Sequence, residues 1–495
     1  KLGGVHMVIF WSILDAIIII NTILAIITVF RTPRDIAATW AWLLVLIFIP
    51  TFGFIVYAFF GRRMPKSSLL RLSGSAKKQV KRQIKQQKQK LGKFNDKENP
   101  NNKMVNDSQG LVKFFMNTAS APLLGHNEIE TFTNGPDFIK QLFTDFRNAK
   151  SSINIEFYAF SHDKIGRQIL DLLVEKAQEG VDVRVVYDAW GSMGTTEKFF
   201  KPLIDGGGRA FPFLHNKLNI KDMRVNFRDH HKLVTVDGEF GYIGGLNIGD
   251  QYMGWSKKFG NWHDCTIRIH GDGVYGLQSR FILDWNGTDL KSQIDPNDPD
   301  NIAKYYPEME TDGNAIIQVV ASGPDSTMEQ IKMGYIKLIE MAEKSIKITT
   351  PYLIPDESVL NALKIAAKSG VNVEIVTPDM PDHPFVYRAT QYYSRQLMHL
   401  GVKVYAYNNG FMHAKTIVVD DKLVSVGSAN MDYRSFELNF ECNAFVYDEK
   451  LAQKMEEIYA QNIAESTLQT EKIFKDQSAW LNFKQHFSRL LSPLL

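Results

Sequence analysis

Two stretches of the sequence decide the fold: His230-His-Lys-Leu-Val-Thr-Val-Asp237 and His413-Ala-Lys-Thr-Ile-Val-Val-Asp420. Both read His-x-Lys-x4-Asp, and six further residues separate each aspartate from Gly244-Gly-Leu-Asn247 or from Gly427-Ser-Ala-Asn430. One His-x-Lys is common by chance. Two copies of the longer frame, each with β-branched residues typical of a strand, indicate an internal duplication.

The flanking sequence repeats in the same order. Each copy has a strand, a helix and a second strand, so each half is predicted to be an α/β layer structure. We therefore expect an α/β fold with two pseudo-symmetric domains that share one active-site cleft. The matching pairs are Ala149–Glu156 with Ala342–Thr349, Ile169–Gln178 with Val359–Lys368, and Gly180–Val186 with Gly370–Val376.

The motif spacing predicts a phosphate-handling site. Residues i and i+2 of a strand point to one face, so each His projects with its Lys. The two asparagines follow Gly-rich turns, where backbone N–H groups can approach an anion. Two imidazoles, two ammonium groups and two carboxamides would then meet around a phosphodiester, with one His attacking and the other protonating the leaving oxygen. No run of Asp, Glu, His or Cys has metal-ligand spacing, so we predict neither a metal nor a cofactor.

The N-terminal sequence predicts membrane insertion. Met7–Phe30 and Ile36–Phe60 are each longer than the roughly 20 residues that a spanning helix needs. The short connector Arg31–Asp35 would join them as a two-helix transmembrane hairpin over residues 1–61. Two buried core helices are the alternative.

A basic segment follows the hairpin. Residues 61–110 hold 14 Lys and Arg against three Asp and Glu, and the rest of the chain beyond them is net acidic. The positive-inside rule puts this segment and the catalytic body on the cytoplasmic side, beside anionic lipids. Lys77–Lys93 is either a helix near the headgroups or a flexible linker. We expect a multi-pass protein of the cytoplasmic membrane.

The paired motifs resemble the HKD motifs of the phospholipase D superfamily, and the rest of the chain resembles bacterial cardiolipin synthases. The supporting residues span both halves and the C-terminus: Tyr187-Asp188, Gly191-Ser192, Arg228, Thr350–Pro355, Asn430–Phe436, Asn439–Glu441 and Leu491–Leu495. The resemblance implies condensation of two phosphatidylglycerols into cardiolipin and glycerol, without nucleic acid. A homo-oligomer is compatible with it, and phosphatidylethanolamine is left open as a co-substrate.

The resemblance also implies roles for residues. His230 would be the nucleophile that carries a phosphatidyl-His intermediate, and His413 the acid and base. Lys232, Lys415, Asn247 and Asn430 would bind substrate phosphate. Asp237 and Asp420 complete the catalytic motifs, and the resemblance implies that they are structural.

Two further carboxylates are candidates for orienting the imidazoles. Asp264 precedes Cys265 and Glu441 precedes Cys442, at comparable distances after the motifs. A carboxylate on the far ring nitrogen would fix the tautomer and stabilise imidazolium. A salt bridge at a strand edge is the alternative. Both cysteines are expected to be small core residues.

Other side chains near the motifs are weaker candidates. We expect His231 and His263 to be structural or at the rim of the site. Tyr352, Tyr392 and Tyr393 are core residues or line a lipid channel.

The last residues predict an amphipathic helix. Trp480, Phe483, Phe487, Leu490, Leu491 and Leu494 recur every three or four residues. The helix would lie in the membrane interface or pack on the body.

The predicted domain organisation is a hairpin (1–61), a basic linker (62–110), a first domain (111–305) and a second domain (306–495) that ends in this helix.

Two rival functions stay open. A different HKD enzyme, a phospholipase D or an anchored nuclease, would use the same motifs. A nuclease should have a basic, aromatic-lined body, and this body is net acidic. A non-catalytic membrane scaffold is disfavoured because both motifs are intact.

Overall fold

The structure is a computed structural model that describes residues 2–31, 36–61, 64, 74–95, 97–214, 226–326 and 328–494. They divide into two compact units. One comprises residues 1–67 and 215–227, and the other comprises residues 68–214 and 228–495. We call the second unit the body.

The N-terminal unit contains one helix long and apolar enough to cross a membrane. This helix, α1 (Leu2–Arg31), includes an apolar stretch of 21 residues, Trp11–Arg31. The second apolar run is divided into α2 (Ile36–Phe48), α3 (Pro50–Val56) and the π-helical turn η1 (Tyr57–Gly61).

The prediction of a second span over Ile36–Phe60 is not confirmed, because this apolar run is divided at Pro50. Pro50 has no N–H to donate to the helix, and Ile49 before it leaves helical geometry. The rings of Trp42 and Tyr57 lie 5.2 Å apart, whereas a continuous helix would separate these residues by about 22 Å. The second run therefore folds back on itself, and the two-helix hairpin is not confirmed.

The body is built from two sheets with the same strand order, which confirms the predicted repeat of α/β halves. The first sheet runs β4-β3-β2-β6-β7-β8-β1 and the second β13-β12-β10-β15-β16-β18-β9. In each, a parallel pair such as β2–β3 continues into antiparallel strands. The strands of the first are β1 (Leu124–Asn134), β2 (Ser152–Phe157), β3 (Asp182–Tyr187), β4 (Arg209–Pro212), β6 (Lys232–Val236), β7 (Phe240–Gly244) and β8 (Trp262–Gly271); those of the second are β9 (Ala315–Ser322), β10 (Ser345–Thr349), β12 (Asn372–Pro378), β13 (Lys403–Tyr407), β15 (Thr416–Val419), β16 (Leu423–Gly427) and β18 (Asn439–Tyr447).

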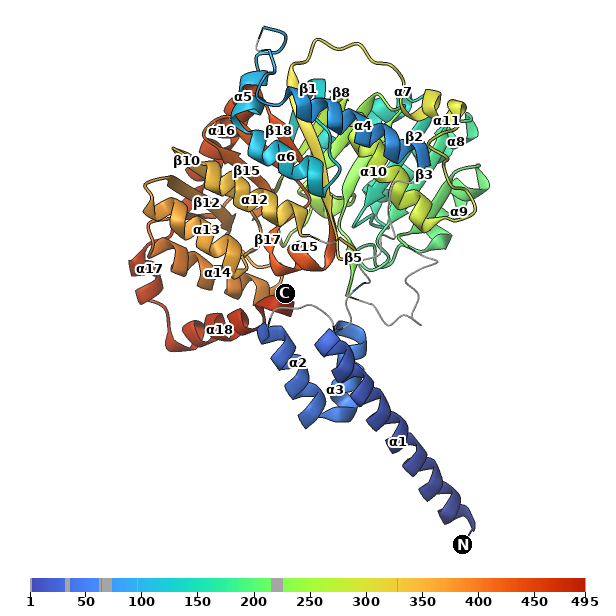
Figure 1. Cartoon of the computed structure of the whole chain (residues 1–495), viewed down its shortest axis with the longest axis vertical. Helices are drawn as coiled ribbons and strands as arrows, with labels where there is room; N and C mark the ends of the chain where they lie inside the picture. Colours follow the sequence, from blue (N-terminus) through green and yellow to red (C-terminus); the bar gives the residue numbers. More distant parts are fainter. Residues whose placement is uncertain are drawn as a thin grey trace. The chain divides into compact units, whose positions relative to one another are not determined.

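The two halves lie side by side in the body and are joined by strand pairings between them (Figure 1). β1 pairs with β9, β5 (Arg228–Asp229) pairs with β18, and β14 (Phe411–Met412) pairs with β8. These last two pairings place the residues just before each motif against the last long strand of the opposite sheet.

Helices cover both sheets. The predicted helices over Ile169–Gln178 and Val359–Lys368 are confirmed as parts of α8 (Lys164–Gln178) and α13 (Glu357–Lys368). Asp163 and Asp356 cap them by accepting bonds from backbone N–H groups. The remaining helices are α7 (Gly135–Asn148), α9 (Glu197–Asp205), η3 (Asp250–Met253), α10 (Gly273–Thr288), α11 (Pro299–Tyr305), α12 (Gln330–Met341), α14 (Pro384–Met398), α15 (Tyr433–Glu437), α16 (Glu449–Ala464), α17 (Glu471–Lys475), α18 (Ala479–Leu490) and η4 (Ser492–Leu494), and the short strands are β11 (Leu353–Ile354), β17 (Met431–Asp432) and β19 (Ser466–Leu468).

Much of the predicted basic linker is ordered on the body. It forms α4 (Gly74–Lys90) and α5 (Asn102–Asp107) and runs into α6 (Gln109–Thr118). Ile84 and Leu91 are buried in the hydrophobic core of the second half. The flexible-linker alternative is therefore wrong for this stretch, and most of residues 62–73 lie outside the described part of the chain.

Candidate active site

The two motif histidines begin at the junction between the halves. The His230 backbone N–H donates to Phe440 O at 2.9 Å, and that of His413 donates to His263 O at 2.7 Å. Each motif is thereby tied to the last long strand of the opposite half. Both imidazoles are more than nine-tenths buried.

Each imidazole is bound by a carboxylate from the other half. His230 Nδ1–H donates to both Glu441 oxygens at 2.9 Å, and His413 Nδ1–H donates to Asp264 Oδ2 at 2.7 Å. The structure therefore brings both predicted carboxylates to the imidazoles. The exchange between halves leaves Nε2 as the ring nitrogen available for chemistry.

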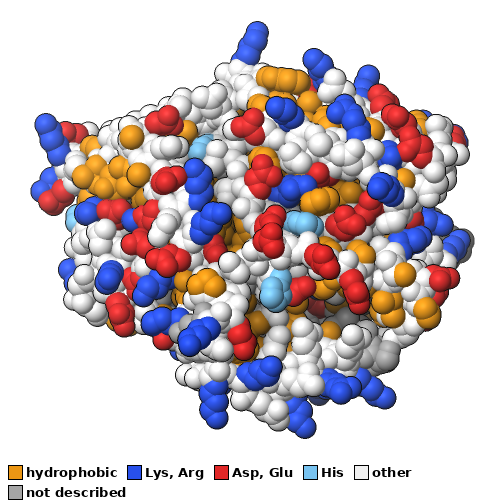
Figure 2. Space-filling model, turned by 90° about the horizontal axis from the view of Figure 1, so that it is seen from above, with side chains coloured by type: hydrophobic (Ala, Val, Ile, Leu, Met, Phe, Trp, Pro, Cys, Tyr) orange, Lys and Arg blue, Asp and Glu red, His pale blue; other side chains and the backbone are white. Residues whose placement is uncertain are grey.

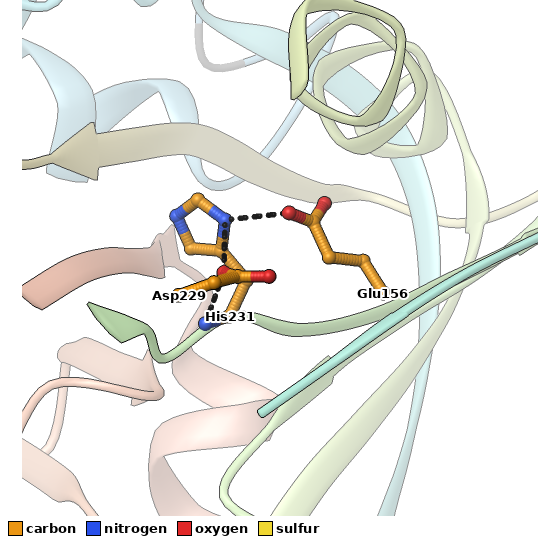
Figure 3. A group of neighbouring side chains, drawn as sticks. All are labelled: Glu156, Asp229 and His231. Carbon is orange, nitrogen blue, oxygen red and sulfur yellow. Dashed lines mark hydrogen bonds and ion pairs between the residues drawn. The ribbon is translucent and has the colours of Figure 1, made fainter. Parts of the chain in front are cut away.

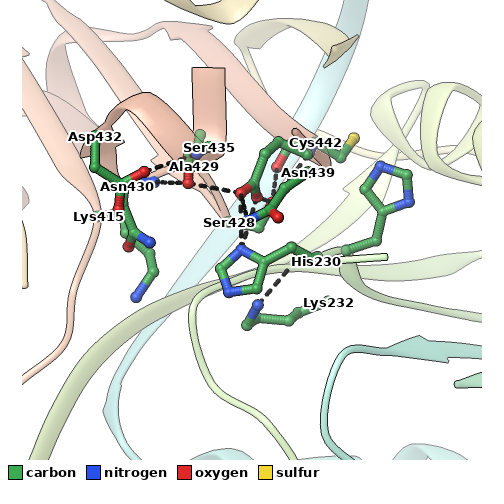
Figure 4. Close-up of polar contacts among 12 residues, drawn as sticks. His230, Lys232, Lys415, Ser428, Ala429, Asn430, Asp432, Ser435, Asn439 and Cys442 are labelled. Atoms are coloured by element: carbon green, nitrogen blue, oxygen red, sulfur yellow. Dashed lines mark hydrogen bonds and ion pairs between the residues drawn. The ribbon is translucent and has the colours of Figure 1, made fainter. Parts of the chain in front are cut away.

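The two carboxylates have different surroundings. Glu441 also accepts bonds from Ser428 at 2.5 Å, Ser435 at 2.7 Å and Asn439 at 3.2 Å, grouped around His230 in Figure 4. Burial nevertheless raises the pKa of Glu441 to about 7. Sequence analysis missed these three donors. Ser428 and Asn439 lie within quoted motifs, but nothing in their spacing indicates a shared acceptor.

The pKa of Asp264 is shifted in the opposite direction. Burial raises its pKa, but the charge of Lys415 and the hydrogen bond from His413 outweigh that effect and leave the pKa below the usual value. The surroundings thus lower the pKa of Asp264 and raise that of Glu441. The two halves are therefore chemically unequal.

One residue position accounts for part of this inequality. Gly245 occupies the place that Ser428 has in the second motif. A Cβ at Gly245 would lie 2.0 Å from Asp264 Oδ1, so no side chain fits there. The shorter first-half carboxylate thus approaches the backbone directly, while the longer Glu441 leaves room for a serine hydroxyl.

Both motif lysines bend back to their own strand. Lys232 Nζ donates to His230 O at 2.8 Å, and Lys415 Nζ donates to His413 O. Burial lowers the pKa of Lys232 to about 7 and of Lys415 to about 8. A bound phosphate would restore these charges, so the lysines are suited to an anionic ligand.

Both imidazoles are neutral near neutral pH. Burial, followed by the charge of Lys415, lowers the pKa of His413 to about 4. Burial and the charges of Lys232, Lys415 and His413 lower the pKa of His230 well below its usual value. His230 of the first motif and Ser428 of the second both bind Glu441, so these two parts of the motifs lie close together.

The motif asparagines are held in different ways. Asn247 Oδ1 accepts a bond from the Ala159 N–H at 3.1 Å, which fixes the orientation of its amide. The backbone N–H of Asn430 donates to Ser435 Oγ at 3.1 Å. Asn430 Oδ1 is buried without a hydrogen-bond partner among the described residues. It is an acceptor that a substrate hydroxyl can satisfy.

The motif aspartates bind backbone N–H groups rather than the imidazoles. Asp237 Oδ1 accepts bonds from the N–H groups of Ser151 and Ser152, at 2.8 and 2.9 Å. Asp420 Oδ1 does the same for Lys344 and Ser345, at 2.7 and 2.8 Å. Both aspartates lie at hairpin turns and hold the start of the neighbouring strand, as the resemblance implied.

A second group of titratable side chains surrounds His231, the residue after His230 (Figure 3). His231 Nδ1 is 3.2 Å from Glu156 Oε1 and 3.3 Å from Asp229 Oδ1, and all three residues are buried. Their ligand atoms lie within 4.8 Å of one another, so they are able to hold a metal ion. Sequence analysis excluded such a cluster because Glu156 lies on a distant strand.

Charge within that group is partly balanced. Asp284 lies 3.5 Å from the same nitrogen and is paired with Arg280. Burial raises the pKa of both Glu156 and Asp229 well above the usual value. Protons can therefore neutralise the group in place of a metal.

The remaining candidates are structural. Cys265 and Cys442 are buried free thiols, and burial raises their pKa. His263 packs against Tyr407. Tyr352 is half-buried with its ring 6.5 Å from His413, and Tyr393 is buried in the second core.

The repeat and its exchanged imidazole–carboxylate pairs define a phospholipase D-type protein. Residues 142–269 and 335–463 match the family described as "Cardiolipin synthase, PLD-like domain", and residues 20–62 match "Phospholipase_D-nuclease N-terminal". A cardiolipin synthase from Listeria monocytogenes (serotype 4a, strain HCC23) is 45% identical over 98% of this chain and 99% of that protein. One from Staphylococcus aureus (strain Mu50) is 42% identical over 98% and 97%. The chain belongs to the cardiolipin synthase family.

A solved structure supports the fold. The crystal structure of a phosphatidylserine synthase from Haemophilus influenzae matches with a TM-score of 0.59 at 17% identity, over 79% of this chain and all of that one. At this identity the similarity supports the two-half architecture alone.

Proposed function

We propose that this chain condenses two phosphatidylglycerols into cardiolipin and glycerol through a phosphatidyl-His intermediate on His230. The observation that carries the proposal is the pair of buried imidazoles, each bound through Nδ1 by a carboxylate of the opposite half. Near-full-length similarity to cardiolipin synthases supplies the substrate.

In the first step, His230 Nε2 attacks the phosphorus of one phosphatidylglycerol. The P–O bond to the headgroup glycerol breaks, and the glycerol oxygen takes a proton from His413 Nε2. Lys232, Lys415 and the two motif asparagines hold the non-bridging oxygens. The low pKa of His230 keeps this imidazole unprotonated and ready to attack.

His413 needs a proton for that step. His413 becomes protonated when the phosphodiester binds, because the negative charge of the phosphodiester raises the pKa of a nearby imidazole. In the second step the neutral His413 accepts a proton from the headgroup hydroxyl of a second phosphatidylglycerol. That oxygen attacks phosphorus, the P–N bond breaks, and cardiolipin leaves.

The assignment of roles is supported by the unequal carboxylates. An ionised carboxylate stabilises imidazolium, which an acid–base histidine must form. The pKa of Asp264 beside His413 is lowered, and that of Glu441 beside His230 is raised to about 7. This difference favours His413 as the acid and base, and His230 as the nucleophile.

The choice of acceptor is supported by burial. Water and an alcohol can both attack the intermediate, so only exclusion of water favours transfer. His230 is 8% exposed and His413 7%. A shared cleft closed by the two lipid substrates would keep water from the phosphorus.

The same proposal covers the membrane. α1 is the anchor, and the basic segment after it favours a cytoplasmic body. Nucleic acid is not the expected ligand. On the face of the body drawn in Figure 2, Lys and Arg side chains are interspersed with Asp and Glu, without a continuous basic stripe among the described residues.

Reconstitution tests the proposal. The full chain in phosphatidylglycerol vesicles, with chelator and no added metal, should release one glycerol for each cardiolipin formed. His230→Ala and His413→Ala should abolish both products. Phosphatidic acid in place of cardiolipin would make the chain a phospholipase D, and wild-type silence on phosphatidylglycerol and phosphatidylethanolamine would favour a scaffold.

A further inference from the structure

The C-terminal helix α18 is packed with its polar side inward. A helix on a globular body normally buries its apolar stripe. In α18, Gln485 and Ser488 are each 1% exposed, whereas Trp480 is 64% and Leu490 71% exposed. The body therefore leaves the apolar stripe of this helix uncovered.

Specific polar contacts fix that orientation. Gln485 Nε2 donates to Gln391 Oε1 at 3.2 Å, and Arg395 donates to Asn482 Oδ1 at 3.0 Å. Arg489 lies over the Tyr392 ring, at 5.2 Å. All three partners are on α14, so α18 is attached to the body by its hydrophilic face. Turning it over would break these bonds.

The outward face is a continuous aromatic surface. The rings of Trp480 and Phe483 stack at 5.4 Å, and those of Phe483 and Phe487 at 6.1 Å. Phe483 is 56% exposed and Phe487 45%. With Leu490 they form one apolar stripe, which we call the α18 stripe (Trp480, Phe483, Phe487 and Leu490).

The charged residues of α18 indicate what the stripe binds. α18 carries Lys484 and Arg489 and no Asp or Glu. An apolar aromatic stripe on a helix whose charged side chains are all cations is typical of helices that lie in the interface of an anionic bilayer. A protein partner would need no such charge bias.

The stripe is connected to the active site. α18 packs on α14, α14 packs on β11, and β11 pairs with β17, which begins at the residue after Asn430. η4, just after α18, contacts α15, which carries Ser435. Displacement of α18 can therefore reach the donors around Glu441.

We infer that the α18 stripe inserts into the interface of a phosphatidylglycerol-containing bilayer and seats the second half of the body on its lipid substrate. The inference takes only the identity of the lipid from the proposed function. It favours the interfacial helix over packing alone, because the described helix packs on the body and still presents its apolar stripe outward.

Fluorescence quenching tests the insertion. Cys265 and Cys442 are 2% and 1% exposed, so a cysteine introduced by Phe487→Cys can be labelled selectively in the folded full chain. The labelled chain is reconstituted in phosphatidylglycerol–phosphatidylcholine vesicles, with or without bromine on the acyl chains. The matched control is Ile365→Cys on α13, because Ile365 is 67% exposed.

We expect bromine to quench the label at residue 487 at least about threefold more strongly than the label at 365. Equal quenching at both positions would overturn the inference. Protection of residue 487 that depends on the protein-to-lipid ratio and not on bromine would assign the stripe to a second copy and would also overturn it. Phe483→Cys repeats the measurement should Phe487→Cys fail to fold.

The quenching needs no turnover, so it succeeds or fails independently of the proposed reaction.

A kinetic experiment tests whether the stripe also matters for activity. Trp480→Ser combined with Phe483→Ser should raise the phosphatidylglycerol fraction that gives half-maximal rate about fivefold, with kcat nearly unchanged. Ile365→Ser should change neither. A fall in kcat at constant half-saturation would contradict the seating role.

Discussion

At the scale of single residues, the two imidazoles differ through the carboxylates behind them. Asp264→Asn removes the ionised group that stabilises protonated His413, so kcat should fall about 10³-fold. Glu441→Gln leaves Ser428, Ser435 and Asn439 in place and should cost about tenfold less. Cardiolipin formation in vesicles measures both.

Thermal unfolding is the control, because both changes are close in shape to the original residue. Midpoints within a few degrees of wild type would separate an effect on chemistry from an effect on folding. A larger loss in Glu441→Gln than in Asp264→Asn would exchange the roles assigned to His230 and His413.

The lysines predict how the free enzyme responds to pH. Burial lowers the pKa of Lys232 to about 7 and of Lys415 to about 8. The ammonium forms that bind phosphate are lost as pH rises through these values, so kcat/KM should fall on the alkaline side. The alkaline limb of the pH profile of kcat should lie at a higher pH than that of kcat/KM, because bound phosphate favours the charged lysines.

Lys232→Arg separates this cause from others, since a guanidinium does not deprotonate in this range. The alkaline limb of kcat/KM should then move up to the value of Lys415. A limb that stays near pH 7 in this variant would assign it to the Glu441 carboxyl, whose pKa burial also raises to about 7.

Residue spacing predicted the histidines, lysines and asparagines of the site because the repeat places them in the same frame twice. It also indicated Asp264 and Glu441. The exchange of these carboxylates between halves was not predictable, since it depends on the pairing of β5 with β18 and of β14 with β8. The group around His231 was missed because Glu156 and Asp284 lie far from it in the sequence and reach it through the packing of β2 and α10 within the first half.

At the scale of elements, the motif aspartates stabilise two hairpins. Asp237 has a φ of 55° and Asp420 of 52°, a left-handed conformation that few side chains tolerate. Asp237→Ala loses its bonds to three backbone N–H groups and keeps the strained φ. We expect a loss of about 3 kcal/mol in the free energy of unfolding.

Chemical denaturation measures that loss. Asp237→Asn should lose less, because asparagine tolerates positive φ and keeps one acceptor. Activity per folded molecule should remain near normal in both variants. A folded Asp237→Asn protein with negligible turnover would return this residue to the catalytic set.

The predicted second membrane span was not confirmed because a proline lies within the long apolar run. The run Ile36–Phe60 satisfies the length and hydrophobicity of a span, and these quantities do not register one proline. Pro50 ends α2, and Gly53 then lets α3 approach α2, since a Cβ there would lie 2.6 Å from Val45 O. Close backbone packing of this kind is invisible to hydropathy.

The buried acidic group around His231 predicts that two neutral substitutions have unequal effects on stability and turnover. Burial raises the pKa of Glu156 well above its usual value, and glutamine matches the neutral side chain in shape, so Glu156→Gln should leave the unfolding midpoint and turnover nearly unchanged. Asp284→Asn leaves Arg280 buried without its ion-pair partner and should cost about 3–5 kcal/mol. Elemental analysis of the purified chain completes the measurement: stoichiometric metal that Glu156→Gln abolishes would replace protons with a metal site.

At the scale of the whole molecule, neither half contains a complete site. His230 depends on Glu441, and His413 depends on Asp264. Residues around Ile84 and Phe115 also complete the core of the second half. A chain divided between Glu310 and Thr311, in the connection before β9, should therefore be inactive as either fragment alone. The two fragments expressed together should regain cardiolipin synthesis, because β1–β9, β5–β18 and β14–β8 supply the interface.

Complementation with variants makes the test specific to the exchanged carboxylates. A first fragment carrying His230→Ala joined to a second carrying Glu441→Gln damages one imidazole–carboxylate pair twice, so its loss should match His230→Ala alone. A first fragment carrying Asp264→Asn joined to a second carrying Glu441→Gln damages both pairs, so the two losses should multiply. Turnover from either fragment alone would mean that one half builds a site without the other, and the exchange of carboxylates would then be a feature of packing rather than of catalysis.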